Sequence, residues 1–345
     1  MGEKSKEQSL IALCVFGSLF CSLLLNLFII WASRKFGLFV DTAISDKPQR
    51  FHTLPTPRAG GIGIFAPFFF VSLFLLHTQS NFLYATLIGG SLVFLSGLIE
   101  DFNASLSPKI RLFLQCLGGG IFIYLSDLYL SHLGFGIILP SYIGIPFTLF
   151  AIVGIINAIN IIDGFNGLAG GIALFALICI AFLCQQNLEL ISLLTLIGGI
   201  LGFLLLNFPK GKIFLGDGGA YFLGFILAVF LIFLTQQKDS LVSPWFGIGL
   251  LIYPFWEVIF SIYRRRFREK TAAMLPDNQH FHQLLFQKIH SNPKTSLAIL
   301  AFTFPFMTFA YYFHTNEKIL LLESGSFILI YLSIYQKLRK SSLFL

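Results

Sequence analysis

A polar, glycine-rich segment between two apolar runs holds the residues whose types and spacing most clearly suggest chemistry. Residues 157–171 read Asn-Ala-Ile-Asn-Ile-Ile-Asp-Gly-Phe-Asn-Gly-Leu-Ala-Gly-Gly and include Asn160, Asp163 and Asn166. Removing amide and carboxyl groups from water at a lipid boundary is costly unless they line a cavity or bind a ligand. Glycines let a backbone approach such a ligand closely. The segment therefore predicts a polar ligand site at a membrane face.

Carboxylates recur at the ends of apolar runs that we place on the same side as this segment. Glu100 and Asp101 end one run, Asp163 belongs to the polar segment, and Asp217 and Asp277 lie in loops on that side. Carboxylates near lysines and glycines suit a hard cation such as Mg²⁺ that holds a phosphate, while another carboxylate serves as base. A single acid at a helix end is often only solvated, but five acids on one face favour a functional site.

Basic and histidine residues occur in loops on that same side. The proline-rich loop 46–61 is basic, which suits either a clamp for a diphosphate or an anchor to the membrane surface, and Lys109 has the same two interpretations. His280 and His282 form a His-x-His pattern in a polar loop, and we expect them to lie outside the packed core. They could bind phosphate, a sugar or a metal, although zinc is disfavoured because no third ligand has suitable spacing.

Glu257 is an acid that we place inside an apolar run, and an arginine run at 264–268 follows it. An acid within the membrane is a candidate for function or for helix pairing. The arginine run favours contact with anionic lipid headgroups over catalysis.

The composition is that of an integral membrane protein. The 345 residues are 56% hydrophobic and 11% charged, with a mean hydropathy of +0.82, whereas a soluble domain has about 25% charged residues. We therefore expect a single all-α, polytopic membrane domain over 1–345 with lipids around it and no nucleic-acid partner.

Apolar runs predict about eleven membrane spans, or ten if two adjoining runs form one, because roughly 20 apolar residues cross the hydrocarbon core. The Lys and Arg residues divide 19 to 4 between the two sides, and the basic side is expected in the cytoplasm. This places the N-terminus in the periplasm, the C-terminus in the cytoplasm and the candidate site on the cytoplasmic face. The predicted spans are 9–32, 60–77, 82–99, 110–126, 138–156, 171–185, 190–206, 219–235, 244–262, 296–313 and 319–335.

Three features together resemble the polyprenyl-phosphate N-acetylhexosamine-1-phosphate transferase family, also called glycosyltransferase family 4. They are the segment 157–171, the stretch Lys-Ile-Phe-Leu-Gly-Asp at 212–217 and the His-x-His loop, and the resemblance covers about 41–285. It implies transfer of a sugar 1-phosphate from a UDP-N-acetylhexosamine, by default UDP-GlcNAc, to undecaprenyl phosphate, with UMP as the other product. It also implies Mg²⁺, or alternatively Mn²⁺, as cofactor, in a bacterial inner membrane and in a pathway such as O-antigen synthesis.

The resemblance assigns roles to particular residues. Glu100 and Asp101 match the acidic pair that activates the lipid phosphate, and Asp217 matches the metal ligand, with Asp101 as a second ligand. The predicted nucleotide-sugar contacts are Asn160, Asp163, Asn166, Lys212, His280 and His282. The predicted phosphate contacts are Lys47, Arg50, His52 and Lys109.

The sequence departs from the family pattern at four places. Glu100, Asn166 and Glu257 each stand where the family has Asp, and Gln283 replaces a further His. The departures argue against the peptidoglycan branch, which makes phospho-N-acetylmuramoyl-pentapeptide lipid, and for the O-antigen or capsule branch. The Glu100 substitution also suggests that the activating role falls to Asp101.

Several alternatives stay open at this stage. The lipid phosphate could attack directly, with Asp101 or Glu100 as base, or one of these acids could form a covalent acyl-phosphate. A carrier or flippase could use the same polar face to bind a phosphorylated lipid or sugar without catalysis, although the outer side offers it almost no charged path. A non-catalytic family member is a further alternative, which the departures keep open, and a homodimer is an expectation that follows from the resemblance.

Overall fold

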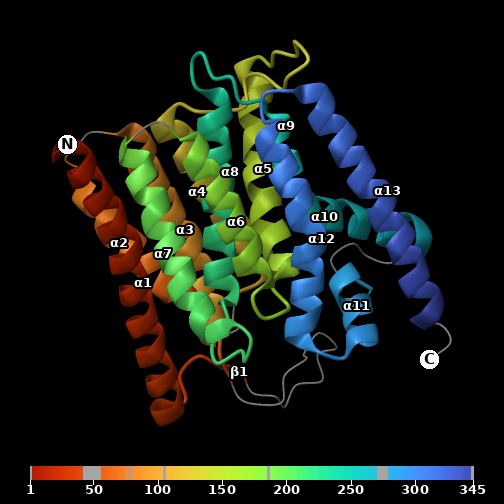
Figure 1. Cartoon of the computed structure of the whole chain (residues 1–345), viewed down its shortest axis with the longest axis horizontal. Coiled ribbons are helices and arrows are strands. Elements are labelled where there is room, and N and C mark those ends of the chain that lie inside the picture. Colours follow the sequence, from red (N-terminus) through yellow and green to blue (C-terminus); the bar gives the residue numbers. More distant parts are fainter. Residues whose placement is uncertain are drawn as a thin grey trace.

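The computed structural model describes residues 2–41, 56–75, 77, 80–103, 106–184, 187–269 and 279–342. Long helices stand side by side in one bundle (Figure 1), so the prediction of an all-α, polytopic membrane protein is confirmed. The helices before the break at 251 are α1 (Gly2–Phe36), α2 (Gly61–Leu75), α3 (Asn81–Asn103), α4 (Pro108–Ser126), α5 (Ser141–Ile162), α6 (Leu168–Leu183), α7 (Asn187–Asn207), α8 (Gly216–Gln236) and α9 (Trp245–Leu250). They are followed by α10 (Ile252–Tyr263), the π-helix η2 (Arg264–Glu269), α11 (Phe281–Ile289), α12 (Asn292–Tyr312) and α13 (Glu317–Ser342).

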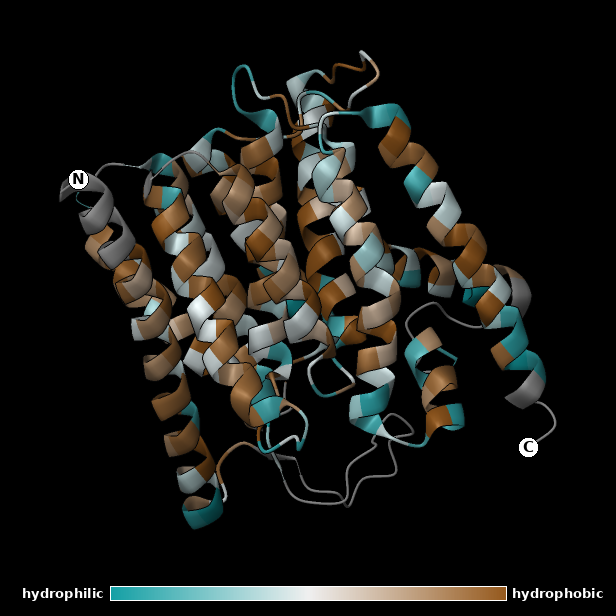
Figure 2. Ribbon diagram, in the orientation of Figure 1, coloured by the Kyte–Doolittle hydropathy of each residue, from teal (hydrophilic) through white to brown (hydrophobic). Residues whose placement is uncertain are grey.

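Ten of the eleven predicted spans each correspond to one helix, but fewer helices meet the length of a full span. In the described part of the chain, eight are long and apolar enough to cross a membrane, and α2 and α6 are apolar but shorter. Colouring by hydropathy shows apolar residues along the upright helices and polar residues mainly at their ends (Figure 2).

The predicted single span over 244–262 is wrong, because the chain there forms two helices, α9 and α10. Leu251 between them has φ −108° and ψ 28°, outside the helical region. Pro254 has no amide hydrogen for the carbonyl of Leu250, which removes the bond that would continue the helix across this point. Figure 1 shows α10 lying crosswise between α12 and α13 rather than upright.

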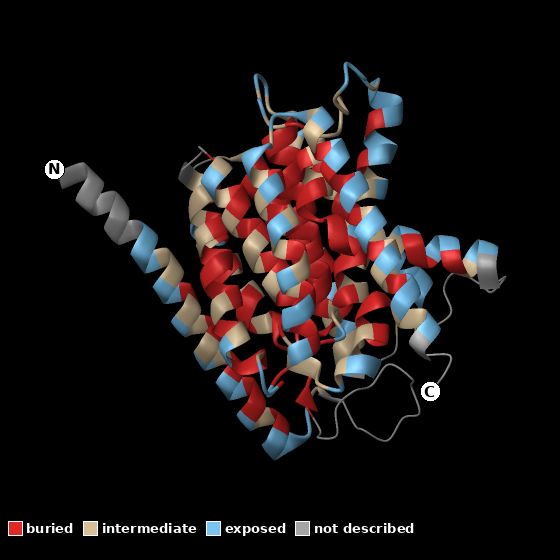
Figure 3. Ribbon diagram, turned by 45° about the vertical axis from the view of Figure 1, so that its right-hand side comes forward, coloured by how far each residue is buried: buried red, intermediate tan, exposed pale blue. Residues whose placement is uncertain are grey.

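Helix α8 forms the centre of the molecule. Its apolar stretch is buried along its whole length, as expected for a helix that is hydrophobic on every face, and α3, α5, α2 and α6 pack around it. Figure 3 shows the buried residues concentrated in the middle of the bundle. The candidate aspartate Asp217 therefore begins the most enclosed helix of the fold.

Small residues set the closest helix contacts. A side chain at Gly198 or Gly202 of α7 would collide with backbone atoms of α1, since an ideal Cβ would lie 2.1 Å from the Val15 oxygen and 2.4 Å from the Leu19 oxygen. Such small-xxx-small patterns let membrane helices approach to backbone contact. The two-stranded ladder of β1 (Val40–Asp41) and β2 (Thr56–Pro57) then connects this α1 side to the start of α2.

Candidate active site

The start of α8 is fixed by backbone contacts with the end of α3. Gly216 has φ +79°, a conformation that strongly favours glycine, and a Cβ there would lie 2.3 Å from the Arg58 carbonyl oxygen. A Cβ at Gly97 of α3 would lie 2.4 Å from the amide nitrogen of Gly218. Because nothing larger than glycine fits, the acids that follow on α3 come directly against the first turn of α8.

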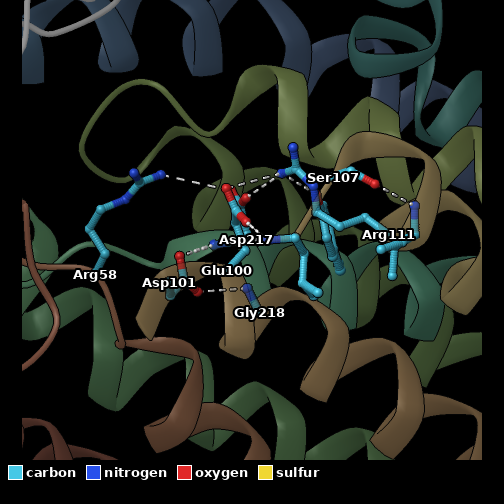
Figure 4. Close-up of polar contacts among 10 residues, drawn as sticks. Arg58, Glu100, Asp101, Ser107, Arg111, Asp217 and Gly218 are labelled. Carbon is cyan, nitrogen blue, oxygen red and sulfur yellow. Dashed lines mark hydrogen bonds and ion pairs between the residues drawn. The ribbon is translucent and has the colours of Figure 1, made fainter. Parts of the chain in front are cut away.

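Asp101 caps α8 from this neighbouring helix. Its Oδ1 accepts a hydrogen bond from the Asp217 amide and its Oδ2 accepts one from the Gly218 amide, both at 2.8 Å (Figure 4). The first amides of a helix have no partner within the helix and carry partial positive charge, which favours a carboxylate there. Asp101 thereby fixes the backbone that carries Asp217.

Asp217 lies between two guanidinium groups, which reach it from opposite sides (Figure 4). Its Oδ2 accepts a hydrogen bond from Arg111 at 3.0 Å, and its Oδ1 lies 3.8 Å from Arg58. The Arg111 nitrogen that makes this bond, Nη1, also lies 3.8 Å from Oε1 of Glu100 and donates to the Tyr221 hydroxyl at 3.3 Å. We call Arg58, Glu100, Asp101, Arg111 and Asp217 the acid–arginine cluster.

The cluster remains open to a ligand. The side chains of Asp217 and Arg58 are 16% and 40% exposed. Arg111 also has a buried Nε–H without a hydrogen-bond partner, and leaving a buried donor unpaired costs about 1–3 kcal/mol. An anionic ligand beside Arg111 would satisfy this donor.

The start of α4 explains why Arg111, rather than Lys109, joins the cluster. Ser107 caps the helix, its side chain accepting from the Ile110 amide at 3.4 Å, and Pro108 follows in the first turn. Lys109 is exposed, whereas Arg111 turns toward Asp217. From the sequence, Arg111 has the same two interpretations as Lys109, a phosphate contact or an anchor, and its contact with Asp217 was not predicted. The sequence signal that could have found it is Gln115, a buried amide four residues later, which indicates that this face of the helix is polar and points inward.

The polar segment 157–171 reaches the cluster through Asp163. This residue ends α5, and Asn160 lies in the last turn before it, half-buried. Burial raises the pKa of Asp163 well above its usual range, the charges of Asp217 and Asp101 raise it further, and Arg58 opposes them. Asp163 therefore lies close enough to Asp217, Asp101 and Arg58 for their charges to act on it.

Asn166 is engaged with neighbouring loops. Its side-chain amide donates to the Pro209 carbonyl at 3.0 Å, and its backbone amide donates to the side-chain oxygen of Asn292 at 2.8 Å. These bonds fasten the turn after α5 to the loop after α7 and to the start of α12. Asn166, which was predicted to contact the nucleotide, thus holds these loops together through its hydrogen bonds.

Asn207 also joins the turn after α5 to the loop after α7, and it was not among the candidates from the sequence. Its side-chain oxygen accepts from the Gly167 amide at 2.6 Å, and its side-chain nitrogen donates to the Ile213 carbonyl at 2.8 Å. The signal was an amide residue at the end of an apolar run, directly before Phe-Pro. Lys212, in the same loop, is exposed.

The two histidines are buried, so the expectation that they lie outside the packed core is wrong. His280 is the N-cap residue of α11, and its ring nitrogen Nδ1 lies 2.9 Å from Oε1 of Glu257. His282 packs beside the polar segment, because an ideal Cβ on Gly164 would lie 4.0 Å from its Nε2. The fold thus brings the His-x-His pattern to the Asp163 turn. Lys47, Arg50, His52 and Asp277 lie outside the described residues.

The start of α8 offers oxygen donors of the type that Mg²⁺ prefers. Within the described ranges, no three His, Cys, Asp or Glu side chains are grouped so that they alone could hold a metal ion. Mg²⁺ is usually bound by only one or two carboxylates together with water and substrate phosphates. Asp217 and Asp101, held side by side at the start of α8, supply carboxylates of that kind.

Comparison with known proteins gives one family and a consistent set of relatives. Residues 83–235 match the model of glycosyl transferase family 4. The undecaprenyl-phosphate alpha-N-acetylglucosaminyl 1-phosphate transferase of Yersinia pestis is 30% identical over 278 residues, covering 76% of this chain and 74% of the relative. The Escherichia coli K12 protein of that name is 31% identical over 273 residues, covering 74% and 71%. A Bacillus subtilis protein, named as a probable undecaprenyl-phosphate N-acetylglucosaminyl 1-phosphate transferase, is 28% identical over 272 residues, covering 76% and 75%.

Proposed function

This chain belongs to glycosyl transferase family 4, and from that premise we propose that it transfers N-acetylglucosamine 1-phosphate from UDP-GlcNAc to undecaprenyl phosphate. The products are undecaprenyl-diphosphate N-acetylglucosamine and UMP. The names of the relatives supply the substrates, and the acid–arginine cluster is the observation in this chain that carries the proposal. A carrier or flippase would need no such cluster of carboxylates and guanidiniums at the start of a buried helix.

The two arginines are proposed to bind the diphosphate of the donor. A guanidinium offers five N–H donors in a planar fork, so Arg111 can keep its bond to Asp217 and still donate a hydrogen bond to a phosphate oxygen. Its unpartnered Nε–H supports this assignment. Holding the diphosphate in one orientation and neutralising its charge are the main contributions that a protein makes to phosphoryl transfer.

The acidic pair is proposed to prepare the lipid phosphate. An oxygen of undecaprenyl phosphate attacks the phosphorus that bears the sugar, the diphosphate bond breaks, and UMP leaves. Glu100 accepts one amide bond, from Leu106 at 3.1 Å, whereas both oxygens of Asp101 are engaged with α8. Either carboxylate can act as base in this direct attack, and a covalent acyl-phosphate on one of them is the competing mechanism.

Asp217, with Asp101 beside it, is proposed to hold Mg²⁺, which Mn²⁺ could replace. When bound, the ion would supply positive charge to the oxygens of the donor diphosphate. Asn160, Asp163, Lys212 and His282 are proposed to contact the nucleotide sugar, since their segments converge on the same end of the bundle.

We further propose that the cluster faces the cytoplasm from a bacterial inner membrane, with the N-terminus in the periplasm. The 19 to 4 division of Lys and Arg supports this orientation. The product would begin a surface glycan such as O-antigen. A homodimer is proposed on the family resemblance and is tested by measuring the mass of the protein–detergent complex.

UMP release by purified protein in detergent tests the function. Undecaprenyl phosphate and a panel of UDP-sugars are supplied with and without Mg²⁺, beside Asp217→Ala and Asp101→Asn variants whose thermal unfolding is also measured. We expect Mg²⁺-dependent release with UDP-GlcNAc that both substitutions abolish. Folded protein that binds undecaprenyl phosphate but releases no UMP from any UDP-sugar would overturn the proposal and favour a carrier or a non-catalytic protein.

A further inference from the structure

A second buried polar network lies beside the acid–arginine cluster and is centred on Glu257 of α10. Oε1 of this carboxylate accepts a hydrogen bond from the Phe281 amide at 3.1 Å and lies 2.9 Å from Nδ1 of His280. Oε2 accepts a hydrogen bond from the Tyr331 hydroxyl at 2.8 Å. Glu257 is only 1% exposed, and a buried carboxyl group needs such donors to offset its loss of water.

His280 is held at both of its ring nitrogens. Because the Glu257 carboxylate accepts, Nδ1 of His280 carries a proton, and Nε2 faces the Arg265 guanidinium at 3.3 Å. The backbone amide of His280 also donates to the side chain of Gln283 at 3.1 Å. A ring fixed on both sides cannot turn toward a substrate without breaking buried hydrogen bonds. His280 is therefore better suited to supporting its loop than to contacting a ligand.

His282 has a different environment. Its Nδ1 lies 3.2 Å from the hydroxyl of Tyr253, which is one helical turn before Glu257 on the same face of α10. The opposite ring nitrogen, Nε2, is directed toward the turn at Gly164. The rings of His280 and His282 are parallel, with planes 2° apart and centroids 5.3 Å apart. Fixing the first ring therefore restricts the second.

Helix α13 supports the same loop from the other side. Tyr331 bonds Glu257, and Tyr335, one turn later, donates to the Gln279 carbonyl at 3.1 Å. Both hydroxyls belong to a helix outside residues 83–235, the part that matches the family model. The chain thus uses its last helix to fix a loop that reaches the candidate active site.

We infer that Tyr253, Glu257 and Tyr331 are positioning residues that hold His282 against the Asp163–Gly164 turn, where it contacts the nucleotide sugar. His280 transmits this support and does not itself touch the substrate. The inference rests on the proposed function and divides the His-x-His pattern into one supporting and one substrate-contacting residue. Ligand-contacting histidines commonly depend on such a second hydrogen-bonded partner for their orientation.

The test is a pair of double-mutant cycles that link each tyrosine to His282. Steady-state UMP release is measured for Tyr253→Phe and Tyr331→Phe, alone and combined with His282→Ala. We expect each tyrosine variant to lower kcat/KM for UDP-GlcNAc by about tenfold, the loss of one buried hydrogen bond, and to leave KM for undecaprenyl phosphate unchanged. In the His282→Ala background, neither tyrosine change should lower activity further, because the side chain that they position is absent.

The matched control is Tyr312→Phe, which removes the hydroxyl of an exposed tyrosine in the last turn of α12. It should leave kcat/KM and thermal unfolding as in the unaltered protein. A general structural role for Tyr253 and Tyr331 would instead give losses that multiply with that of His282→Ala and that follow the thermal midpoint. That result, or full activity of both tyrosine variants, would overturn the inference.

A readout without catalysis separates this inference from the proposed function. Nitrogen-15 NMR of labelled histidines, assigned with His280→Asn and His282→Asn, reports which ring nitrogen carries the proton. We expect His280 to be protonated at Nδ1 and Tyr253→Phe to shift the His282 signals. Unshifted His282 signals would overturn the positioning role even in an active enzyme. Absence of UMP release from the unaltered protein would refute the proposed function and, with it, the substrate contact of His282, whatever the spectra show.

Discussion

The acid–arginine cluster and the Glu257 network lie at the same end of the molecule but are built in different ways. In the cluster, glycines bring α3 and α8 into backbone contact, and full charges face one another across a partly exposed site. In the network, long side chains from α10, α11 and α13 meet in an enclosed space through hydrogen bonds. The first arrangement leaves charges available to a ligand, and the second holds a loop still.

This difference predicts how each region responds to substitution. Losing a charge in the cluster should remove activity and leave the fold intact, because the cluster keeps like charges close together for function. Losing Glu257, the acceptor that the network shares, should reduce stability and activity together, because three buried donors are left unsatisfied.

Asp217→Asn should lower kcat by about 10³-fold, the size expected when a group that stabilises transition-state charge is removed. The apparent thermal midpoint should change little, because asparagine still offers an oxygen to Arg111 and its loss of the attraction to the arginines is offset by less repulsion from Asp101. UMP release and thermal unfolding in detergent are measured on the same preparation. Asp127→Asn, at the C-terminal end of α4, is the control. A large fall in the thermal midpoint of Asp217→Asn would remove the proposed contrast between the regions.

Glu257→Ala should destabilise the protein by at least about 3 kcal/mol, since it leaves three buried donors without an acceptor, each at a cost of about 1–3 kcal/mol. Those donors are Nδ1 of His280, the Phe281 amide and the Tyr331 hydroxyl. Both the thermal midpoint and the activity should fall. Activity lost at an unchanged midpoint would mean that Glu257 behaves like a member of the cluster.

Arg111→Lys should lower kcat/KM for UDP-GlcNAc by about 30-fold, because an ammonium cannot replace a planar fork that contacts several groups at once. Arg111 lies against Asp217, Glu100 and Tyr221 through one nitrogen and retains an unpartnered Nε–H. Arg34→Lys, in the last turn of α1, is the matched control and should be silent. Equal effects of the two changes would show that Arg111 acts only as a basic anchor.

Gly97→Ala should destabilise the junction of α3 and α8 by about 1–3 kcal/mol, the range typical of overpacking. Its methyl group would meet the Gly218 amide at 2.4 Å, so the two helices must separate. Gly120→Ala in α4 is the control, since a Cβ there meets nothing within 4 Å, and alanine favours a helix. A Gly97→Ala protein as stable and active as the control would contradict the role given to this contact.

Asp163→Asn should give a small gain in thermal midpoint that grows with pH. The folded-state pKa of Asp163 is raised, by burial first and by Asp217 and Asp101 next. Its contribution to stability is therefore present below the unfolded pKa of about 4 and is lost as the pH rises toward the folded value. Asparagine does not titrate and avoids this loss. Midpoints compared at pH 5 and pH 8 test the prediction, and a gap that does not widen with pH would refute it.

The sequence was sufficient for the helices and for much of the chemistry. Apolar runs located ten helices to within a few residues at most of their ends, because lipid exposure and burial both demand apolar side chains. The break at Leu251 was missed because its two helices form one continuous apolar run. The acids Glu100, Asp101 and Asp217 were found because carboxylates are rare in such a chain, and the structure brings them together.

Arginines were harder to assign, because their positive charge also marks the cytoplasmic ends of membrane helices. From the sequence, Arg58 and Arg111 could be either phosphate contacts or anchors, and only their contacts with Asp217 distinguish them from Arg34 and Lys35. The histidines show the opposite error. A polar local sequence suggested exposure, but His280 is buried against Glu257, 23 positions away, which in turn bonds Tyr331, a further 74 positions from Glu257.

Composition and local spacing were enough to predict the membrane-embedded helical class, the family and the set of carboxylates. The tertiary structure alone decided which cations meet those carboxylates, that Asp101 caps α8, and that α13 supports the histidine loop. Such pairings join segments separated by many residues, and they depend on where glycines allow helices to touch. No local pattern encodes that geometry, because it arises from the packing of the whole bundle.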